Sequence, residues 1–347
     1  MHAPLQVLAM SFLAMSLFAA PRDGMPAEPA AAVDAAFRSG AACIGRAVDS
    51  KGTFGDPYLA YEYPDERLPH PEGSRRLTYR VIDAYAILTM LRRAGPLPSE
   101  LEGISAQAEE ALRALAPAWR GRGFTNTLRN PRTDGIALDT YCIVGWLSAD
   151  ADMAREVVDA IEGDRWLPAG WYDDLQTFRA AADESWCLRL ALSAGRSDPS
   201  VARVRDRLTA DLVKARQKNP TGPDAFYRAW HFGMLAADGK LPDAQRAIID
   251  IFSAWADAHV RKGRTAREDI AEWVNLASSE TLAHAGARGA RIAKLATQAM
   301  LRHQDPDGCW TIPGARPAND GYAFLTLRAL LALQVHRAAS RPTGEHP

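Results

Sequence analysis

The chain has 347 residues, with 41 Lys and Arg against 42 Asp and Glu, and 47% of its positions are hydrophobic. These are ordinary values for a globular protein, and they exclude disordered and collagen-like chains. The formal net charge of -1 offers no basic excess to neutralise phosphates, so we expect no nucleic-acid partner.

The longest apolar stretch lies at the amino terminus, from Leu5 to Ala20, and three polar residues interrupt it. It is shorter than the roughly 20 residues that span a bilayer, so we expect no stable membrane span. Small residues such as Ala19, Ala20 and Ala27 are typical of signal-peptidase cleavage sites. We therefore predict that residues 1–29 are a signal peptide and linker and that the protein is exported, to the periplasm or the medium. A frayed amphipathic terminus is the alternative.

An acid, a spacer and an aromatic residue recur ahead of apolar runs along the chain. The clear copies are Asp83–Tyr85, Asp139–Tyr141, Glu184–Trp186, Asp224–Phe226 and Asp320–Tyr322, and a degenerate copy runs from Asp269 to Trp273. Successive acids are separated by 56, 45, 40, 45 and 51 residues. A period of this size is typical of helical-hairpin repeats.

Amphipathic segments alternate with these acid-led runs. Apolar residues at spacings of three and four predict outer helices near 31–48, 99–118, 151–162, 199–216, 242–261 and 288–303. Ser99 followed by Glu102 predicts a capping box at one helix start. The acid-led runs are apolar nearly all round, which predicts burial on most sides.

Six exposed and six buried helices without strand signals predict an all-α fold. We expect an α/α toroid of the (α/α)6 type, about six hairpins in one domain over 30–338, with a disordered tail over 339–347. The long outer-to-inner joints and the inner-helix amino termini then meet at one end, which is the expected functional face.

The segment from Gln304 to Trp310 reads Gln-Asp-Pro-Asp-Gly-Cys-Trp. Together with the apolar helices before and after it, over 295–333, it resembles the Q-x(n)-D-G-x-W repeat of the terpenoid-cyclase and protein-prenyltransferase superfamily. The resemblance implies an α/α toroid and an isoprenoid ligand. A purely structural interpretation is that Gln304 and Trp310 fasten adjacent hairpins while Gly308 provides the turn.

The active-site motifs of that superfamily do not transfer to this chain. The D-x-D-D acid motif of class II cyclases is absent. The zinc-binding Asp-x-Cys of the prenyltransferase β-subunits matches Asp307 and Cys309, but Ala323 stands where the family has its histidine. We therefore expect no metal and no cofactor.

Polar residues concentrate on the fourth and fifth inner helices. We predict Asp224 and Glu272 as an acid/base pair, His231 as a group that orients or shares a proton, and Asp139 as a further catalytic candidate. Asn275 continues the stripe of Glu272. The candidate substrate-binding residues are Asp83, Tyr85, Tyr141, Glu184, Trp186, Tyr227, Trp230, Trp273, Asp320 and Tyr322. The alternative is that the acids cap helices, the histidine is a satisfied core residue and the aromatic residues pack the wall.

Three functions stay open at this point. The resemblance implies an isoprenoid, whereas export and the missing D-x-D-D motif favour a glycan, cleaved by a hydrolase or lyase of (α/α)6 type. The third alternative is a non-catalytic binding or scaffold protein. In each case we expect a monomer with a small-molecule or glycan ligand.

The four cysteines can be placed against the repeat. Cys142 and Cys187 each follow the repeat aromatic directly, which predicts that they are neighbours on successive inner helices. Cys43 and Cys309 approach each other only if the ring closes. A disulfide at either pair is compatible with export, but we expect buried thiols.

Overall fold

The computed structural model describes residues 30–47, 79–122, 124–125, 136–162, 177–233, 241–261, 267–279, 281–282, 285–311 and 322–340. The predicted signal peptide and linker lie outside these residues. The last helix extends to Ser340, two residues into the segment predicted as a tail.

The described residues form an all-α fold, as predicted. One set of helices follows the outer segments of the sequence: α1 (Ala30–Ala47), α4 (Ser99–Trp119), α6 (Ala151–Glu162), α8 (Pro199–Lys218), α10 (Pro242–Arg261) and α12 (Gly286–Arg302). The helices that alternate with them are α3 (Tyr79–Ala94), α5 (Leu138–Leu147), α7 (Thr177–Ser193), α9 (Pro223–Gly233), α11 (Ile270–Ala277) and α13 (Tyr322–Ser340). A 3-10 turn, η2 (Arg267–Asp269), precedes α11. No helix in the described part of the chain is both long and apolar enough to cross a bilayer.

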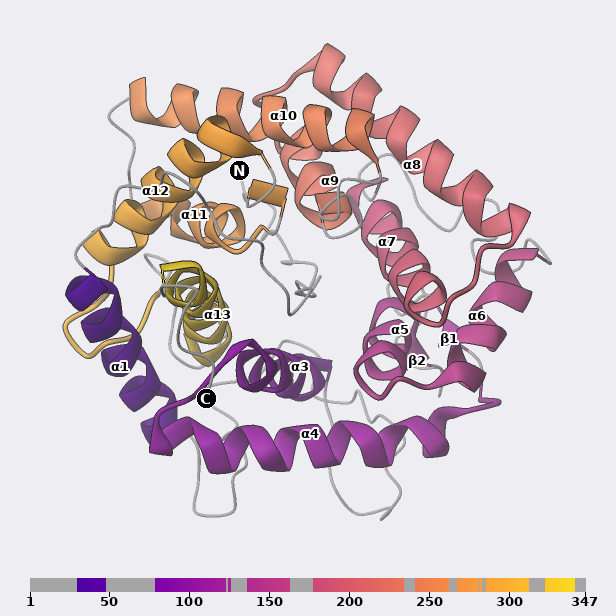
Figure 1. Ribbon diagram of the computed structural model, residues 1–347, viewed down its shortest axis with the longest axis horizontal. Coiled ribbons are helices and arrows are strands. Elements are labelled where there is room, and N and C mark those ends of the chain that lie inside the picture. Colours follow the sequence, from indigo (N-terminus) through magenta and orange to yellow (C-terminus); the bar gives the residue numbers. More distant parts are fainter. Residues whose placement is uncertain are drawn as a thin grey trace, which may run out of the picture.

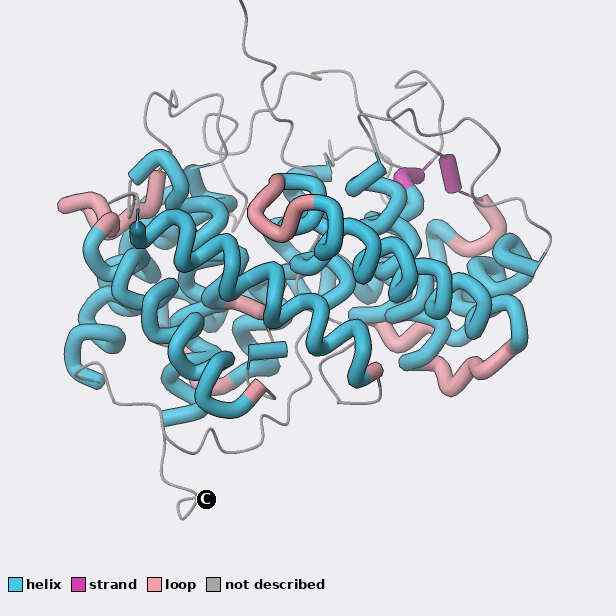
Figure 2. Tube along the Cα trace, turned by 90° about the horizontal axis from the view of Figure 1, so that it is seen from above, coloured by secondary structure: helices cyan, strands magenta, loops and turns pink. Residues whose placement is uncertain are grey.

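The second set of helices lies around the middle of the molecule and the first set lies outside it (Figure 1). Each outer helix from α4 onward packs against the inner helix that precedes it, and α1 packs against α13 at the other end of the chain. Two short strands, β1 (Phe124–Thr125) and β2 (Ile136–Ala137), pair in parallel. They lie at one end of the helices (Figure 2).

The two sets differ in burial as their sequences predict. In α5, eight of the ten residues are buried. In α8, the buried side chains include Val201, Val204, Leu208 and Leu212, at spacings of three and four. A helix that is apolar all round needs neighbours on most sides, whereas an amphipathic helix needs one covered face.

The predicted capping box at Ser99 is wrong. The N-cap residue of α4 is Pro98, and no side chain caps that end. The backbone N–H groups of Leu101 and Glu102 both donate to the Pro98 carbonyl, at 3.0 and 3.1 Å. Ser99 is therefore already the first helical residue, and its hydroxyl donates to the neighbouring Glu100 at 3.2 Å.

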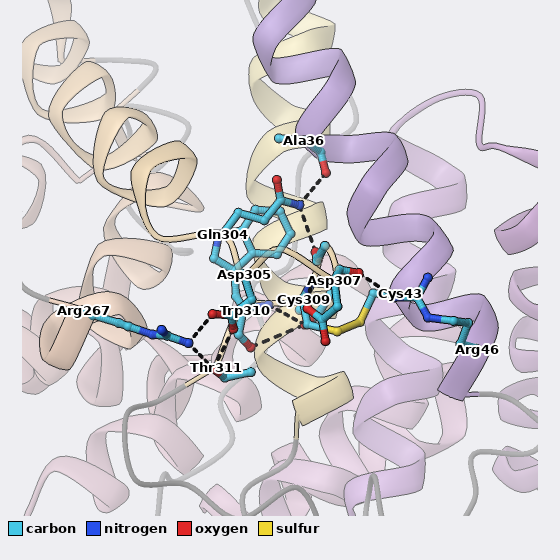
Figure 3. Close-up of a disulfide and its surroundings, with 12 residues drawn as sticks. Ala36, Cys43, Arg46, Arg267, Gln304, Asp305, Asp307, Cys309, Trp310 and Thr311 are labelled. Carbon is cyan, nitrogen blue, oxygen red and sulfur yellow. Dashed lines mark hydrogen bonds and ion pairs between the residues drawn. A yellow bond between two sulfur atoms is a disulfide. The ribbon is translucent and has the colours of Figure 1, made fainter.

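A disulfide joins the first outer helix to the last hairpin. It links Cys43 of α1 to Cys309, 266 residues further along the chain, as Figure 3 shows. The expectation of buried thiols is wrong for this pair. Helix α1 packs against α13 from the other end of the chain, and Cys43 and Cys309 are bonded to each other. At the second pair the expectation holds, since the Cys142 and Cys187 sulfurs are buried thiols 3.7 Å apart, which confirms that they are neighbours.

The Gln304–Trp310 motif fastens the same seam between α1 and the last hairpin. The Gln304 amide donates to the carbonyls of Ala36 in α1, at 2.9 Å, and of Gly308, at 2.8 Å (Figure 3). The Trp310 indole N–H donates to the Met300 carbonyl at 2.9 Å. The Gln304 bond to α1 agrees with the structural interpretation of the motif, whereas the Trp310 bond lies within the last hairpin.

Gly308 makes the turn of this motif with a φ of +89°. A Cβ atom there would lie 2.3 Å from the backbone oxygen of Ser39 in α1. Only glycine combines a positive φ with so close an approach. The sulfur of Cys309 is in the disulfide, so it offers no thiolate to a metal.

Candidate functional site

Helices α9 and α11 meet through polar groups. The Tyr227 hydroxyl donates to the Glu272 carboxyl, at 3.0 Å. Beyond the end of α11, the Thr281 hydroxyl donates to the carbonyl of Gly233, the last residue of α9, at 2.6 Å. These two hydrogen bonds join α9 to α11 and to the segment that follows it.

Helix α13 adds a cation to this region. The Arg328 guanidinium lies over the ring of Trp230, 4.6 Å from its centroid, and 5.6 Å from that of Phe324. Arg328 is only 6% exposed. We call the group formed by Tyr227, Trp230, Glu272, Asn275 and Arg328 the α9–α11–α13 wall.

Burial changes the protonation of the hydrogen-bonded pair in this wall. It raises the pKa of Glu272 above its ordinary value, and the hydrogen bond from Tyr227 and the charge of Arg328 oppose the shift only in part. Burial likewise raises the pKa of Tyr227, with the Glu272 charge acting in the same direction. A carboxyl group with a raised pKa holds its proton closer to neutral pH, which is what a general acid requires.

Several buried polar atoms near this pair have no hydrogen-bond partner within the described segments. They are the indole N–H of Trp230, both amide atoms of Asn275 and the hydroxyl of Ser279. Such groups are rare in folded proteins, and each costs about 1–3 kcal/mol when unpaired. Trp230 and Asn275 lie on the same stripes of α9 and α11 as Tyr227 and Glu272, and Ser279 lies just beyond α11, near Gly233.

The predicted acid/base partners make separate contacts. Asp224 is the second residue of α9, its side chain is 55% exposed, and it pairs with Arg228 at 3.0 Å. Glu272 is joined to Tyr227 instead. His231 is buried and lies against Trp230, with ring centroids 4.5 Å apart.

Other predicted residues lie between the inner and outer layers. The Tyr141 hydroxyl donates to Glu156 of α6, and Trp273 packs edge-on against Trp255 of α10 at 4.9 Å. Trp186 is buried beside Trp146 of α5, at 6.1 Å. These contacts are those expected of wall packing.

The acids of the first two repeats differ from each other. Asp139 is the second residue of α5, and its carboxylate accepts from the Thr140 backbone N–H at 2.6 Å, which fits a helix-end role. Asp83 instead lies in the fifth position of α3 and is buried, as is Tyr85. The prediction for Asp320 falls outside the described residues, and so does that for the side chain of Tyr322.

Glu184 is buried in the interior of α7 and forms an ion pair with Arg207 of α8. Burial outweighs the attraction of Arg207 and raises the pKa of Glu184 to about 7. The structure thus assigns this repeat acid to a contact between the two layers.

Titration of Glu184 predicts a pH-dependent stability. Its pKa is about 7 in the folded protein against an ordinary value of 4.5, so between these two pH values the folded state binds more protons than the unfolded state. The free energy of unfolding, relative to that of Glu184→Gln, should therefore fall as the pH rises from 4.5 to about 7, by roughly 3 kcal/mol. Urea unfolding of both proteins across this range checks the prediction, and a constant difference between them would contradict it.

Two residues of the site regions escaped the sequence analysis. Arg328 is the one charged residue between Tyr322 and Gln334. A single charge in an otherwise apolar helix could have marked it as a candidate site residue. Arg207 lies on the amphipathic helix α8 among other arginines, so nothing in the local pattern separates it from them.

Comparison of the chain with protein-family models, with curated proteins and with solved structures gives no match.

Proposed function

We propose that the fold is an α/α toroid of six helical hairpins in an exported protein. The alternation of inner and outer helices, the packing of α1 on α13, and the Gln304–Trp310 motif at that seam support the toroid. The apolar start of the sequence supports export, and so does the Cys43–Cys309 disulfide, since disulfides persist mainly in oxidising compartments.

The proposed ligand is a glycan bound at the α9–α11–α13 wall, and Glu272 transfers a proton during cleavage of a glycosidic bond. The observation that carries this proposal is the hydrogen bond between Tyr227 and the buried Glu272. Burial raises the pKa of the Glu272 carboxyl group. A carboxyl group whose pKa is raised keeps its proton to a higher pH than an ordinary glutamate and can then pass it to a leaving oxygen. Hydrolases and lyases both remain within this class.

A glycan fits the wall better than an isoprenoid does. Asn275, Ser279 and the Trp230 indole bring buried hydrogen-bonding atoms to this region, and a hydrocarbon ligand offers them no partner. Hydroxyl groups of a sugar can both donate to and accept from these atoms.

Glu272→Gln tests the proposal. The amide oxygen can still accept from Tyr227, but the side chain no longer donates an acidic proton. Turnover of whichever polysaccharide the unmodified protein cleaves should fall by about 10²–10⁴-fold, while binding changes by only a few-fold. Released reducing ends and unsaturated ends measure the reaction and distinguish hydrolysis from elimination.

Two further variants are compared with Glu272→Gln. Glu110→Gln, on the exposed side of α4, is the matched control and should keep full turnover. Asp224→Asn shows whether a second carboxylate takes part. Unchanged turnover in Glu272→Gln would refute proton transfer by this residue, and binding without any turnover in the unmodified protein would support a non-catalytic binding function.

A further inference from the structure

The sulfurs of Cys142 and Cys187 face each other across the contact between α5 and α7. They lie 3.7 Å apart, within reach of a hydrogen bond from one thiol to the other. Both side chains are fully buried. Each cysteine directly follows the aromatic residue of its repeat, so the two sulfurs occupy equivalent positions on successive inner helices. They form a dithiol pair outside the α9–α11–α13 wall.

The packing of α5 against α7 holds this pair in place. The two helices are neighbours in the inner set and contact each other closely (Figure 1). One turn beyond the sulfurs, a Cβ atom on Gly145 of α5 would lie 3.1 Å from a side-chain carbon of Leu190 in α7. In both contacts the partners are 45 residues apart in the sequence, so both belong to one register. The whole contact between the helices therefore keeps the sulfurs close together.

Two sulfurs held in this way need only a small movement to form a bond. The sulfurs of a disulfide lie about 2.0 Å apart, so a pair that starts at 3.7 Å has to close by about 1.7 Å. Side-chain rotation and small shifts of the two helices supply a movement of this size. The entropy lost in bringing the ends of this 45-residue loop together has already been lost when the helices pack.

We propose that Cys142 and Cys187 are a redox-responsive pair, which a small disulfide oxidant such as oxidised glutathione converts into a disulfide between α5 and α7. One cysteine thiolate attacks the oxidant, whose S–S bond breaks and releases one glutathione thiolate. The second cysteine thiolate attacks the cysteine sulfur of the resulting mixed disulfide and releases the second glutathione. Overall the two cysteines lose two protons and two electrons, and the oxidant takes them up to become two thiols.

Burial determines when this exchange takes place. Neither side chain is exposed in the folded protein, and thiols buried in apolar surroundings are inert toward reagents in water. The pair therefore stays in its thiol form at rest. Its oxidation needs an excess of oxidant while α5 and α7 are separated, during folding or local opening. Once formed, the bond fixes the contact between these two helices and favours the folded state.

Equilibration with glutathione tests this proposal. The reduced full chain is diluted from urea into mixtures of reduced and oxidised glutathione, so that its thiols meet the oxidant before they are buried, and a parallel series stays in urea. After alkylation of the remaining thiols, mass spectrometry measures the fraction of chains in which Cys142 and Cys187 are linked. In the folded protein, half of the pairs should be oxidised at a ratio of oxidised to squared reduced glutathione about tenfold or more lower than in urea, because folding brings the sulfurs together.

Cys187→Ser is the matched control. It retains Cys142 and the seam cysteines, so it should show at most a glutathione adduct on Cys142. The comparison of the wild type in the two solvents does not depend on this variant. If the folded protein needs the same ratio as the chain in urea, or a higher one, the native packing gives the bond no advantage and the proposal is refuted. Linkage of Cys142 or Cys187 to Cys43 or Cys309 in place of the expected bond would refute it as well.

Discussion

Replacing Cys309 by serine is expected to lower the free energy of unfolding by about 2–5 kcal/mol. The Cys43–Cys309 bond closes a loop of 266 residues, and a cross-link over so long a loop removes much of the freedom of the unfolded chain. Urea unfolding of the oxidised wild type and of Cys309→Ser measures the difference.

Reductant provides the control for this experiment. Dithiothreitol should bring the wild type to the stability of Cys309→Ser and leave the double variant Cys43→Ser, Cys309→Ser unaffected. The thiols of Cys142 and Cys187 are present in all these proteins, so they do not contribute to the difference. A wild type whose unfolding curve is the same with and without reductant would contradict the prediction.

Gly308→Ala is expected to destabilise the protein by about 3 kcal/mol or more. A positive φ costs an alanine roughly 1–2 kcal/mol, and the added Cβ would lie 2.3 Å from the Ser39 oxygen, so the backbone of the seam must also shift. Thermal and urea unfolding measure the loss.

Gly195→Ala separates the two contributions. Gly195 has a comparable φ of +73°, but nothing lies within 4 Å of the position of its Cβ. Its substitution should cost only the backbone part, about 1–2 kcal/mol. Equal losses in the two variants would show that the close approach to α1 contributes nothing.

The helices that cover the molecule could be predicted closely from the sequence. The expected segments 151–162 and 242–261 coincide with α6 and α10, and 199–216 falls two residues short of the end of α8. Amphipathic helices carry their burial pattern in their own residues, because one face is covered and the other meets water. The capping box failed because Pro98 already provides the first carbonyl acceptor of α4.

The starts of the buried helices were less predictable. The acids of the repeat were expected at helix amino termini, where Asp139 and Asp224 indeed lie, but Asp83 and Glu184 lie well inside α3 and α7. A helix that is apolar all round has no periodic signal to show where it begins. The same acid therefore serves at a helix end in one hairpin and pairs across the layers in another.

The site was predictable in part. The stripes containing Tyr227 and Glu272 were visible because polar residues at spacings of three and four interrupt apolar helices. Their mutual hydrogen bond could not be foreseen, since it depends on how two helices align along their length. The contribution of Arg328 depends on α13 packing beside α11, which is a relation between distant parts of the chain.

The seam between α1 and the last hairpin has a consequence for the order of folding. Helix α1 packs on α13, and its Ala36 carbonyl and Cys43 sulfur bind residues 304 and 309. During synthesis, these partners emerge only when nearly the whole chain is available. Contacts between the two ends of a chain form slowly because loop closure precedes them. We therefore expect α1 to dock last, so that a chain stopped before residue 304 leaves the apolar face of α1 exposed to chaperones or to aggregation.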